Sequence, residues 1–424
     1  MSKIKNWLYL PIEIKVRESD AKLLLAYYAA KKGYEVVIGD HYMVQKASHQ
    51  LPQGIFFSKG YSRGVRKRVI ADAMSHGHKI VELDEEGFIF NDHKYLQDRM
   101  KRDMLALVTQ EYCWGQSQMD VITSAYPDLK DRCHVTGNPR LDLLKPKFRA
   151  IYQAEAEQIR RQFGEFVLIN TRFARYNTAK GKKDHPHFKD IKQLYDRFIE
   201  LVKQTCERFP NINFVIRPHP GENIKSYLQE LSGYRNVHVI HEGNITKWLL
   251  AAKMVIHNGC TSGFEAYLLG QNVISYVPAI SSKQSQSLPD QVGVKASRVD
   301  DVHGIIHDVF KSNRGESVQL KNDLSSDVML YHCEWSNKTY AYESILKLIE
   351  ALPEIYANKS QQHQSLDQHL LLKKSKKEKK RRFSLMESEI KSLFKQLAAI
   401  EGDNKPVNIV PIANNVFRIS GSNV

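Results

Sequence analysis

Short apolar runs alternate with helix-like segments along most of this 424-residue chain. Such alternation is typical of a parallel β-sheet covered by helices on both faces. It predicts one set of strands at 8–12, 34–39, 54–58, 79–83, 105–109 and 134–136, and a second at 166–170, 213–216, 237–240, 254–257 and 273–276. Because one hydrophobic core rarely organises so many residues, we expect an α/β protein with two such domains, at 1–150 and 151–335.

The end of the chain differs in composition from the two predicted domains. Residues 336–355 are predicted to form a closing helix, and 356–424 a basic linker followed by an amphipathic helical tail. Eight residues of 373–382 are basic and one is acidic, so this run carries +7 of the net charge of +15. It is either a solvated charge run or, with the apolar residues that follow to position 400, a surface for anionic membrane or a partner protein.

Other classes of protein are disfavoured by what the sequence lacks. No nucleic-acid-binding motif accompanies the positive charge, so we expect no nucleic acid partner. The five cysteines show no paired spacing, and we expect neither a disulfide framework nor a metal site. Without a secretion signal or a long apolar run, the expected location is cytoplasmic, with the inner membrane face as a peripheral site through 373–400.

An apolar run at 214–216 leads directly into Arg217-Pro218-His219-Pro220. Each proline fixes its own φ angle and keeps the preceding residue extended, so Arg217 and His219 are presented from a stiff loop at the end of a strand. Ligands of open α/β sheets bind at that end of the strands. The loop is therefore a candidate anion site, and an ordinary turn is the alternative.

A second run, 254–257, ends in a segment of small and hydroxyl residues, Asn258-Gly259-Cys260-Thr261-Ser262-Gly263, which begins a predicted helix containing Glu265. Free amide groups and the helix dipole make such a helix start suitable for phosphate. The alternative is that Thr261 and Ser262 only cap the helix.

Longer stretches of the sequence resemble a known family. Residues 242–253, 257–270 and 273–276 resemble the donor-binding half of GT-B glycosyltransferases. Residues 83–88, Leu-Asp-Glu-Glu-Gly-Phe, are similar to the acidic D/E-D/E-G motif that bacterial CMP-sialic acid and related CMP-ulosonate transferases combine with a His-Pro motif. Residues 10–18 and 135–142 resemble bacterial surface carbohydrate biosynthesis proteins, and this likeness extends over about 6–350.

The resemblance implies a GT-B fold, in which two Rossmann-like domains face a central cleft, and a nucleotide sugar bound by the second domain. It needs no cofactor or metal. The donor-binding residues that it implies are Arg217, His219, Pro220, Asn244, Ile245, Asn258, Thr261, Ser262, Gly263 and Glu265. Arg217 can form a bidentate pair with phosphate or a sugar carboxylate, or serve as a structural partner for a neighbouring acid.

Sugar transfer requires a carboxylate that acts as base or nucleophile. We expect it at Glu86, with Glu85 and Asp142 as rivals, and we expect His219 to donate to the departing phosphate. A solvated acidic loop is the alternative for the glutamates, and a helix cap for Asp142. The acceptor-side candidates are Glu13, Arg17, Glu18, Asn138 and Arg140.

These expectations together describe a glycosyltransferase of bacterial surface polysaccharide (capsule or O-antigen) assembly. Its donor would be a CMP-activated ulosonic acid resembling sialic acid or Kdo, and its acceptor a glycan or glycolipid. Three alternatives keep the fold: a UDP-sugar transferase, a UDP-sugar 2-epimerase and a CDP-polyol phosphotransferase. A catalytically silent assembly scaffold is an alternative of another class.

Overall fold

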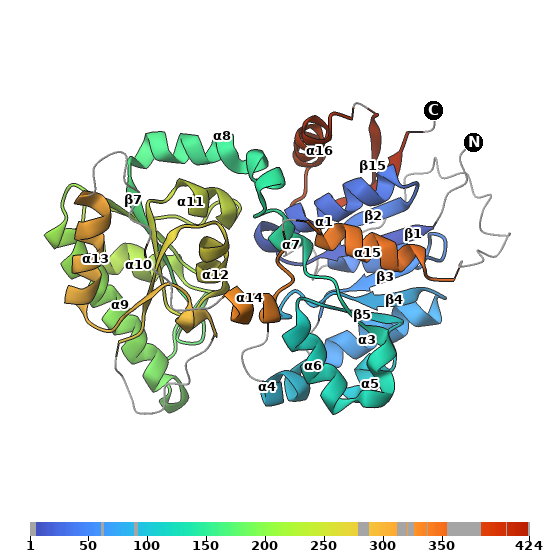
Figure 1. The fold of residues 1–424 in the computed structure, drawn as a ribbon, viewed down its shortest axis with the longest axis horizontal. Coiled ribbons are helices and arrows are strands. Elements are labelled where there is room, and N and C mark those ends of the chain that lie inside the picture. Colours follow the sequence, from blue (N-terminus) through green and yellow to red (C-terminus); the bar gives the residue numbers. More distant parts are fainter. Residues whose placement is uncertain are drawn as a thin grey trace. The chain divides into compact units, whose positions relative to one another are not determined.

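The computed structural model describes residues 6–60, 63–88, 92–278, 288–311, 320, 326–336, 338–353, 383–403 and 405–422, and it divides into two compact units (Figure 1). Unit 1 comprises Met1–Ile151 and Ser326–Val424, and unit 2 comprises Tyr152–Ser325. The sequence predicted a second domain that continued to 335. The chain returns to unit 1 earlier because the segment after 325 packs there: Glu334 N donates to Trp114 O at 2.7 Å, and Cys333 is fully buried.

Unit 1 is built on an eight-stranded sheet with the order β15-β16-β2-β1-β3-β4-β5-β6. Its first six strands in sequence are parallel, and they are β1 (Trp7–Ile12), β2 (Glu35–Asp40), β3 (Ile55–Ser58), β4 (Lys79–Glu82), β5 (Gln110–Cys113) and β6 (Cys133–Val135). Almost every residue of β1 to β4 is buried, as a parallel sheet covered on both faces requires.

Helices surround this sheet. They are α1 (Lys15–Lys31), α2 (His41–Ser48), α3 (Arg63–Ser75), α4 (Asp92–Asp98), α5 (Arg102–Leu105), α6 (Gln116–Ala125), α7 (Pro139–Asp142), α14 (Ser326–His332), α15 (Ala341–Glu350) and α16 (Glu387–Glu401). A further helix, α8 (Pro146–Phe163), spans the boundary between the two units in the sequence.

The strand predicted at 105–109 is wrong. Leu105 ends α5, and the strand β5 begins only at Gln110. The strand β5 was missed because it contains Glu111, a charged residue. Glu111 is fully buried beside Arg66, with 3.7 Å between its carboxylate and the guanidinium. Charged residues are rarely buried unless they are paired, so the apolar run at 105–109 was chosen as the strand instead.

Unit 2 is built on a six-stranded parallel sheet with the order β11-β10-β7-β12-β13-β14. The strands are β7 (Phe166–Asn170), β10 (Asn213–Arg217), β11 (Val237–Val239), β12 (Met254–His257), β13 (Asn272–Tyr276) and β14 (Val294–Ala296). A short hairpin, β8 (Asn177–Thr178) and β9 (Gly181–Lys182), stands apart from the sheet. The helices are α9 (Lys189–Arg208), α10 (Ile224–Glu230), α11 (Ile245–Ala251), α12 (Thr261–Leu268) and α13 (Val299–Lys311).

The predicted separate tail is contradicted by the structure after residue 382. Residues 387–401 form α16, and the last two strands, β15 (Val407–Ala413) and β16 (Val416–Gly421), form a hairpin whose β16 pairs antiparallel with β2. The apolar face expected to meet a membrane is buried within unit 1, where Phe394 packs on Tyr27 with 5.2 Å between ring centroids. The basic run 373–382 lies outside the described residues.

None of the described helices combines the length and the apolar character needed to cross a membrane.

Candidate functional site

The carboxyl ends of the three central strands of unit 2 carry polar residues side by side. Asn170 at the end of β7 is in register with Arg217 of β10 on one side and with His257 of β12 on the other. The strand order reverses around β7, and ligands of open α/β sheets bind at such a reversal. Asn170 is 4% exposed, and neither atom of its side-chain amide has a hydrogen-bond partner among the described residues. A buried amide without partners is costly, which suggests that it serves a ligand or water.

The segment that follows Asn170 contacts both neighbouring loops. Arg172 donates from Nη1 to the carbonyl oxygen of Gly259, in the loop after β12, at 2.8 Å. Phe173 N donates to the buried carboxylate of Glu222, in the loop after β10, at 2.8 Å. The structure therefore brings the two loops predicted from the sequence to one edge of the sheet.

His219 has a defined tautomer in its neutral form. Its Nδ1 accepts a hydrogen bond from Gly221 N at 3.1 Å, so its proton is carried by Nε2. The side chain is exposed, whereas its backbone amide is held by Glu222 at 3.3 Å. The loop therefore holds the His219 side chain in a defined orientation at the surface of unit 2.

The start of α12 presents backbone amides. Its N-cap residue, Cys260, supplies no side-chain cap, so the first turn is not closed by its own N-cap side chain. Gly259 has φ of +76°, and a β-carbon there would lie 2.4 Å from Asp290 Oδ1, so only glycine fits. Thr261 is exposed, Ser262 is half-buried and Gly263 packs over the His257 ring. The helix dipole at this end favours an anion.

The contacts of Arg217 favour the second of its two predicted roles, a structural one, with backbone carbonyls in place of an acid. Its guanidinium donates to the carbonyl oxygens of Glu242 at 2.7 Å and Gly243 at 3.0 Å, and it lies 5.1 Å from the ring centroid of Trp248. Burial lowers the pKa of Arg217 to about 10. The guanidinium therefore supports the turn before α11.

The remaining donor-side candidates lie around the same edge of the sheet. Asn244 is the N-cap of α11, and its Oδ1 accepts from Thr246 N at 2.8 Å. Ile245 is half-buried at the start of that helix, Asn258 is buried at the end of β12, Pro220 is exposed beside His219, and Glu265 is buried on α12. The Asn244 side chain therefore caps α11, and a ligand here would contact the backbone on either side of Asn244.

Asn170, Arg172 and Glu222 were not predicted as site residues. Glu222 was visible as the acid that closes the Arg-Pro-His-Pro-Gly-Glu segment, but its role depends on Thr171 and Tyr227, which the sequence does not place beside it. Asn170 could have been found as the polar residue that ends an otherwise apolar strand.

Replacement of Glu222 by alanine should lower the free energy of unfolding by several kcal/mol. Its carboxylate accepts hydrogen bonds from Thr171 Oγ1, Phe173 N, His219 N and Tyr227 Oη, and each buried donor left without a partner costs about 1–3 kcal/mol. Chemical denaturation followed by circular dichroism measures the loss. Glu165→Ala removes an exposed ion pair with Lys253 and is the matched control. Equal stability of the two variants would contradict this role of Glu222.

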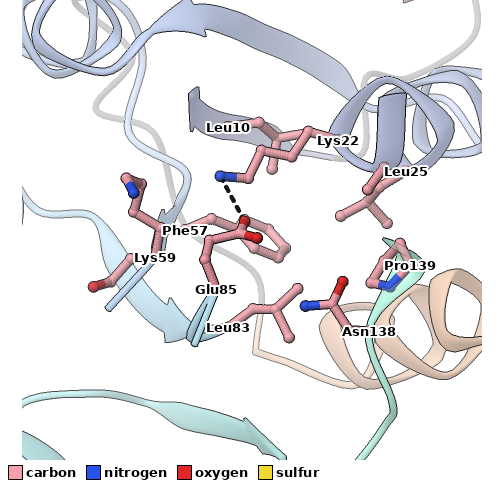
Figure 2. A pocket seen from close by; sticks show the side chains of 11 residues that line it. Leu10, Lys22, Leu25, Phe57, Lys59, Leu83, Glu85, Asn138 and Pro139 are labelled. Atoms are coloured by element: carbon pink, nitrogen blue, oxygen red, sulfur yellow. Dashed lines mark ion pairs between the residues drawn. The ribbon is translucent and has the colours of Figure 1, made fainter. Parts of the chain in front are cut away.

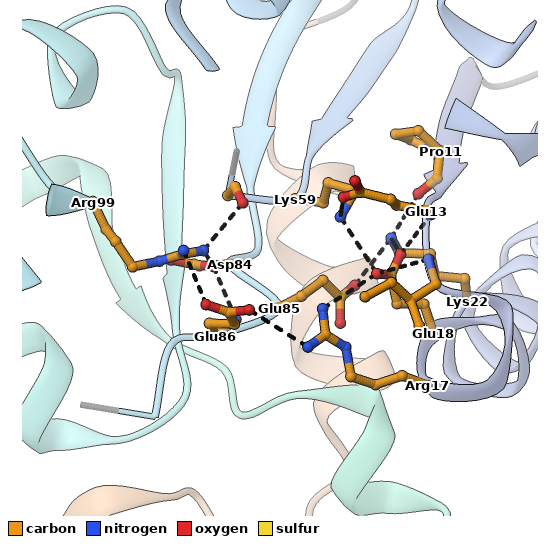
Figure 3. A network of polar contacts seen from close by, with 12 residues as sticks. Pro11, Glu13, Arg17, Glu18, Lys22, Lys59, Asp84, Glu85, Glu86 and Arg99 are labelled. Atoms are coloured by element: carbon orange, nitrogen blue, oxygen red, sulfur yellow. Dashed lines mark hydrogen bonds and ion pairs between the residues drawn. The ribbon is translucent and has the colours of Figure 1, made fainter. Parts of the chain in front are cut away.

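Unit 1 contains a buried network of charges at the carboxyl ends of β1, β3 and β4 (Figure 3). Glu18 is fully buried on α1 and accepts from Glu13 N at 2.9 Å, from Lys22 Nζ at 3.3 Å and from Lys59 Nζ at 3.3 Å. Burial raises the pKa of Glu18, but the two ammonium groups outweigh burial and bring the pKa to about 2. Glu18 therefore remains ionised and fixes the two lysines.

The acidic segment 84–86 joins this network through three different cations. Asp84 is buried and bonds to Arg99, with 2.8 Å from Nε to Oδ2. Glu85 is buried and forms an ion pair with Lys22 at 3.0 Å. The side chain of Glu86 is 57% exposed and lies between Arg99 at 3.1 Å and Arg17 at 3.5 Å. Of the three carboxylates, only that of Glu86 is both accessible and held from two sides.

Gly87 is required by the close approach of a tryptophan ring. A β-carbon at this position would lie 2.4 Å from Cδ1 of Trp114. The tight approach of the indole, whose Nε1 donates to Asp84 O at 2.6 Å, fixes the acidic segment against the core.

A small pocket opens beside the network (Figure 2). Its polar wall consists of Lys22, Ser58, Lys59, Glu85 and Asn138, and its apolar wall includes Leu10, Leu25, Phe57, Leu83 and Pro139. Asn138 caps α7 through its Oδ1, which accepts from Arg140 N at 2.9 Å, and no described residue accepts from its Nδ2. The space, about 10 Å³, is roughly that needed by one water molecule. Asn138 thus lies at the same pocket as Lys22, Lys59 and Glu85 of the charge network, and Arg140, two residues later, is half-buried.

Asp142 is buried, and both of its carboxylate oxygens are engaged by the protein, which does not suit a catalytic carboxylate. It is 1% exposed, its two oxygens accept from Ala341 N and Tyr342 N at 2.9 Å each, and it pairs with Lys145 at 3.1 Å. Burial raises the pKa of Asp142 to about 6. The carboxylate holds the start of α15 against α7, so its function is structural.

Three cations of the network, Lys22, Lys59 and Arg99, were missed in the sequence. Lys22 follows Glu18 by four residues, a spacing that places both on one side of a helix. Lys59 directly follows a predicted strand, as ligand-facing residues often do. Arg99 has no such signal.

The two units are Rossmann-like, with mixed α/β layers around mainly parallel sheets, and together they have the GT-B fold. The chain is similar to a putative UDP-N-acetylglucosamine 2-epimerase from Listeria monocytogenes (TM-score 0.50, 12% identity, 82% of this chain and 96% of that one). It is also similar to the UDP-GlcNAc 2-epimerase from Neisseria meningitidis (TM-score 0.50, 12% identity, 81% and 98%) and to the wall teichoic acid polymerase TagF (TM-score 0.53, 13% identity, 82% and 89%). No protein-family model and no curated protein matches the sequence.

Proposed function

We propose that this protein is a nucleotide-sugar-dependent glycosyltransferase of bacterial surface polysaccharide assembly. The observation that carries the proposal is the buried amide of Asn170, which has no partner among the described residues, at the strand reversal of unit 2, with His219 and the start of α12 on the flanking loops. Backbone amides, the imidazole of His219 and the exposed Arg172 are groups that suit a diphosphate or phosphodiester. Sugar-nucleotide enzymes among the proteins of similar fold support this reading.

The more specific proposal is transfer of a CMP-linked ulosonic acid, similar to sialic acid or Kdo, to a glycan or glycolipid acceptor. It is supported by the acidic segment 84–86 in unit 1 together with the His-Pro loop in unit 2. Glu86 would act as the base on the acceptor hydroxyl, and His219 would donate to the phosphate as it departs. No cofactor or metal takes part in this scheme.

The second candidate is a UDP-sugar 2-epimerase. It is favoured by the similarity in fold to UDP-GlcNAc 2-epimerases. An epimerase needs no acceptor.

Turnover assays distinguish the candidates. The full chain is incubated with CMP-activated ulosonic acids and with UDP-N-acetylglucosamine, each with and without oligosaccharide acceptors, and products are identified by mass spectrometry and NMR. Release of CMP that requires an acceptor, with a new glycosidic product, supports the proposal. Conversion of the UDP-sugar without acceptor identifies an epimerase instead.

Membrane association remains part of the proposal, through the basic run 373–382 alone. Basic residues near an anionic bilayer contribute about 1 kcal/mol each, and the attraction weakens with salt. The full chain should sediment with anionic vesicles and not with neutral ones, and a variant with all eight basic residues replaced by serine should sediment with neither. Equal sedimentation of the two proteins with anionic vesicles would contradict this role.

A further inference from the structure

A cluster of two histidines and one aspartate lies on unit 1, apart from the residues discussed above. His49 directly follows α2, Asp72 is in the last turn of α3, and His76 directly follows that helix. Asp72 and His76 are four residues apart and therefore share one side of the helix. One nitrogen of each imidazole and one oxygen of the carboxylate all lie within 4.8 Å of one another.

Hydrogen bonds orient the three side chains. Gln45 donates from Nε2 to Asp72 Oδ2 at 2.5 Å, and His49 Nε2 lies 2.7 Å from the same oxygen. Nδ1 of His76 lies 2.8 Å from the backbone oxygen of Asp72, to which it donates. This bond leaves Nε2 of His76 with its lone pair, the arrangement found in histidines that ligate metals.

The two helix ends that carry the cluster are fixed to each other. His78 accepts from Gly54 N at 3.1 Å through Nδ1 and donates from Nε2 to Ser48 O at 2.9 Å. Gly77 has φ of +81°, and a β-carbon there would lie 2.3 Å from Gln53 Nε2. The backbone positions of the three residues are thus set before any ion binds.

One adjustment is needed for both imidazoles to hold one ion. Their rings are parallel to within 1°, with 3.9 Å between centroids, and the lone pairs of two parallel rings cannot converge on one point. His49 is exposed, so its ring can turn while an ion replaces its hydrogen bond to Asp72.

We propose that His49, Asp72 and His76 form a binding site for a divalent transition-metal ion of the Zn²⁺ type. Two imidazole nitrogens and one carboxylate oxygen suit Zn²⁺, and water completes a tetrahedral coordination. The ion links the end of α2 to the end of α3. The metal site shares no residue with the proposed nucleotide-binding or acceptor-side residues. Its test is therefore independent of the proposed function.

Titration of the full chain tests the site. Protein treated with a chelator and then freed of it is titrated with Zn²⁺ in competition with a chromophoric chelator, and separately with Co²⁺, whose visible absorption reports tetrahedral coordination. The wild type should bind one ion. His49→Ala, His76→Ala and Asp72→Asn should each weaken binding by at least about tenfold, as loss of even an outer partner of a metal site does.

Two further variants make the result decisive. His93→Ala removes an exposed histidine of α4, which contacts Gln97, and should bind as the wild type does. Circular dichroism and unfolding curves without metal identify any variant that fails to fold. If a ligand variant does not fold, Gln45→Ala replaces it in the test. This change removes only the hydrogen bond that orients the Asp72 carboxylate, and weaker metal binding is expected. Equal binding by the wild type and the His49→Ala/His76→Ala double variant would overturn the proposal, as would the absence of binding by the wild type.

Discussion

Removal of residues 383–424 should unfold unit 1. The segment contributes strand β16, which pairs with β2 through Phe417 opposite Ile38 and Ile419 opposite Val36. Its buried apolar side chains are Leu385, Ile390, Leu393, Phe394, Leu397, Ile412, Val416, Phe417 and Ile419. At about 1.5–3 kcal/mol for each buried side chain, their loss is comparable to or larger than the roughly 5–15 kcal/mol by which a typical protein is stable.

Polar contacts add to this effect. Asn415 links the hairpin to the start of the segment, accepting from Leu385 N at 3.1 Å and donating to Phe383 O at 2.9 Å. Its own backbone oxygen accepts from Asp40 N at 3.0 Å, where a side chain on Gly39 would clash. Deletion therefore exposes both the edge of β2 and the apolar face of α1.

Soluble expression, circular dichroism and hydrogen exchange measure the outcome. The truncated chain should aggregate or lose protection in β1 and β2. The control is the full-length variant with serine at the eight basic positions of 373–382, which changes charge without removing a packed element and should fold normally. A truncated protein as stable as this control would show that α16 and the hairpin are dispensable.

Replacement of Glu86 by glutamine should reduce sugar transfer by about 100- to 10,000-fold, the usual contribution of a general base. The amide keeps the shape of the side chain and removes its basicity. Because the Glu86 side chain is 57% exposed and its arginine partners remain engaged elsewhere, the free energy of unfolding should change by no more than about 1 kcal/mol. Nucleotide binding should persist, since its proposed residues belong to unit 2.

Glu85→Gln is the informative comparison. It leaves the buried Lys22 with Glu18 as its one remaining carboxylate, and weakening a buried pair is costly, so this variant should lose stability as well as turnover. Asp103→Asn alters an exposed pair with Lys67 and should change neither. Transfer by Glu86→Gln at close to the parental rate would exclude Glu86 as the base.

The sequence predicted the layered α/β fold well because its signals are local. Most strands of both sheets are apolar runs, and their positions follow from hydrophobic pattern alone. The hairpin at 407–421 also carries a local signal, two alternating runs around Asn414-Asn415. The apolar residues before it were interpreted as a helix that faces a membrane or a partner protein. The period of a helix shows which face is apolar and does not show what covers it.

The sites were harder to predict because they depend on contacts between distant residues. The loops at 217–222 and 258–263 were identified from prolines, glycines and hydroxyls, and the structure places them on either side of β7. The contacts of Arg217 and Asp142 were not identified from the sequence, because each side chain bonds to backbone groups that only the fold brings near. Arg217 bonds to the turn at 242–243, and Asp142 bonds to the start of α15. For both residues the sequence left a structural role open beside a functional one, and the contacts in the structure favour the structural role.

Equilibrium binding of nucleotides to the full chain tests the central claim most directly. CMP, CDP, UDP and GDP are titrated by calorimetry, with thermal unfolding as a second readout, because a ligand that binds only the folded state raises its stability. CMP should bind most tightly, and Arg172→Ala should weaken this binding while Arg235→Ala, which changes a residue of unit 2 outside the proposed site, should not. Binding of none of the four nucleotides would contradict the account, and preference for UDP would contradict its CMP-sugar donor.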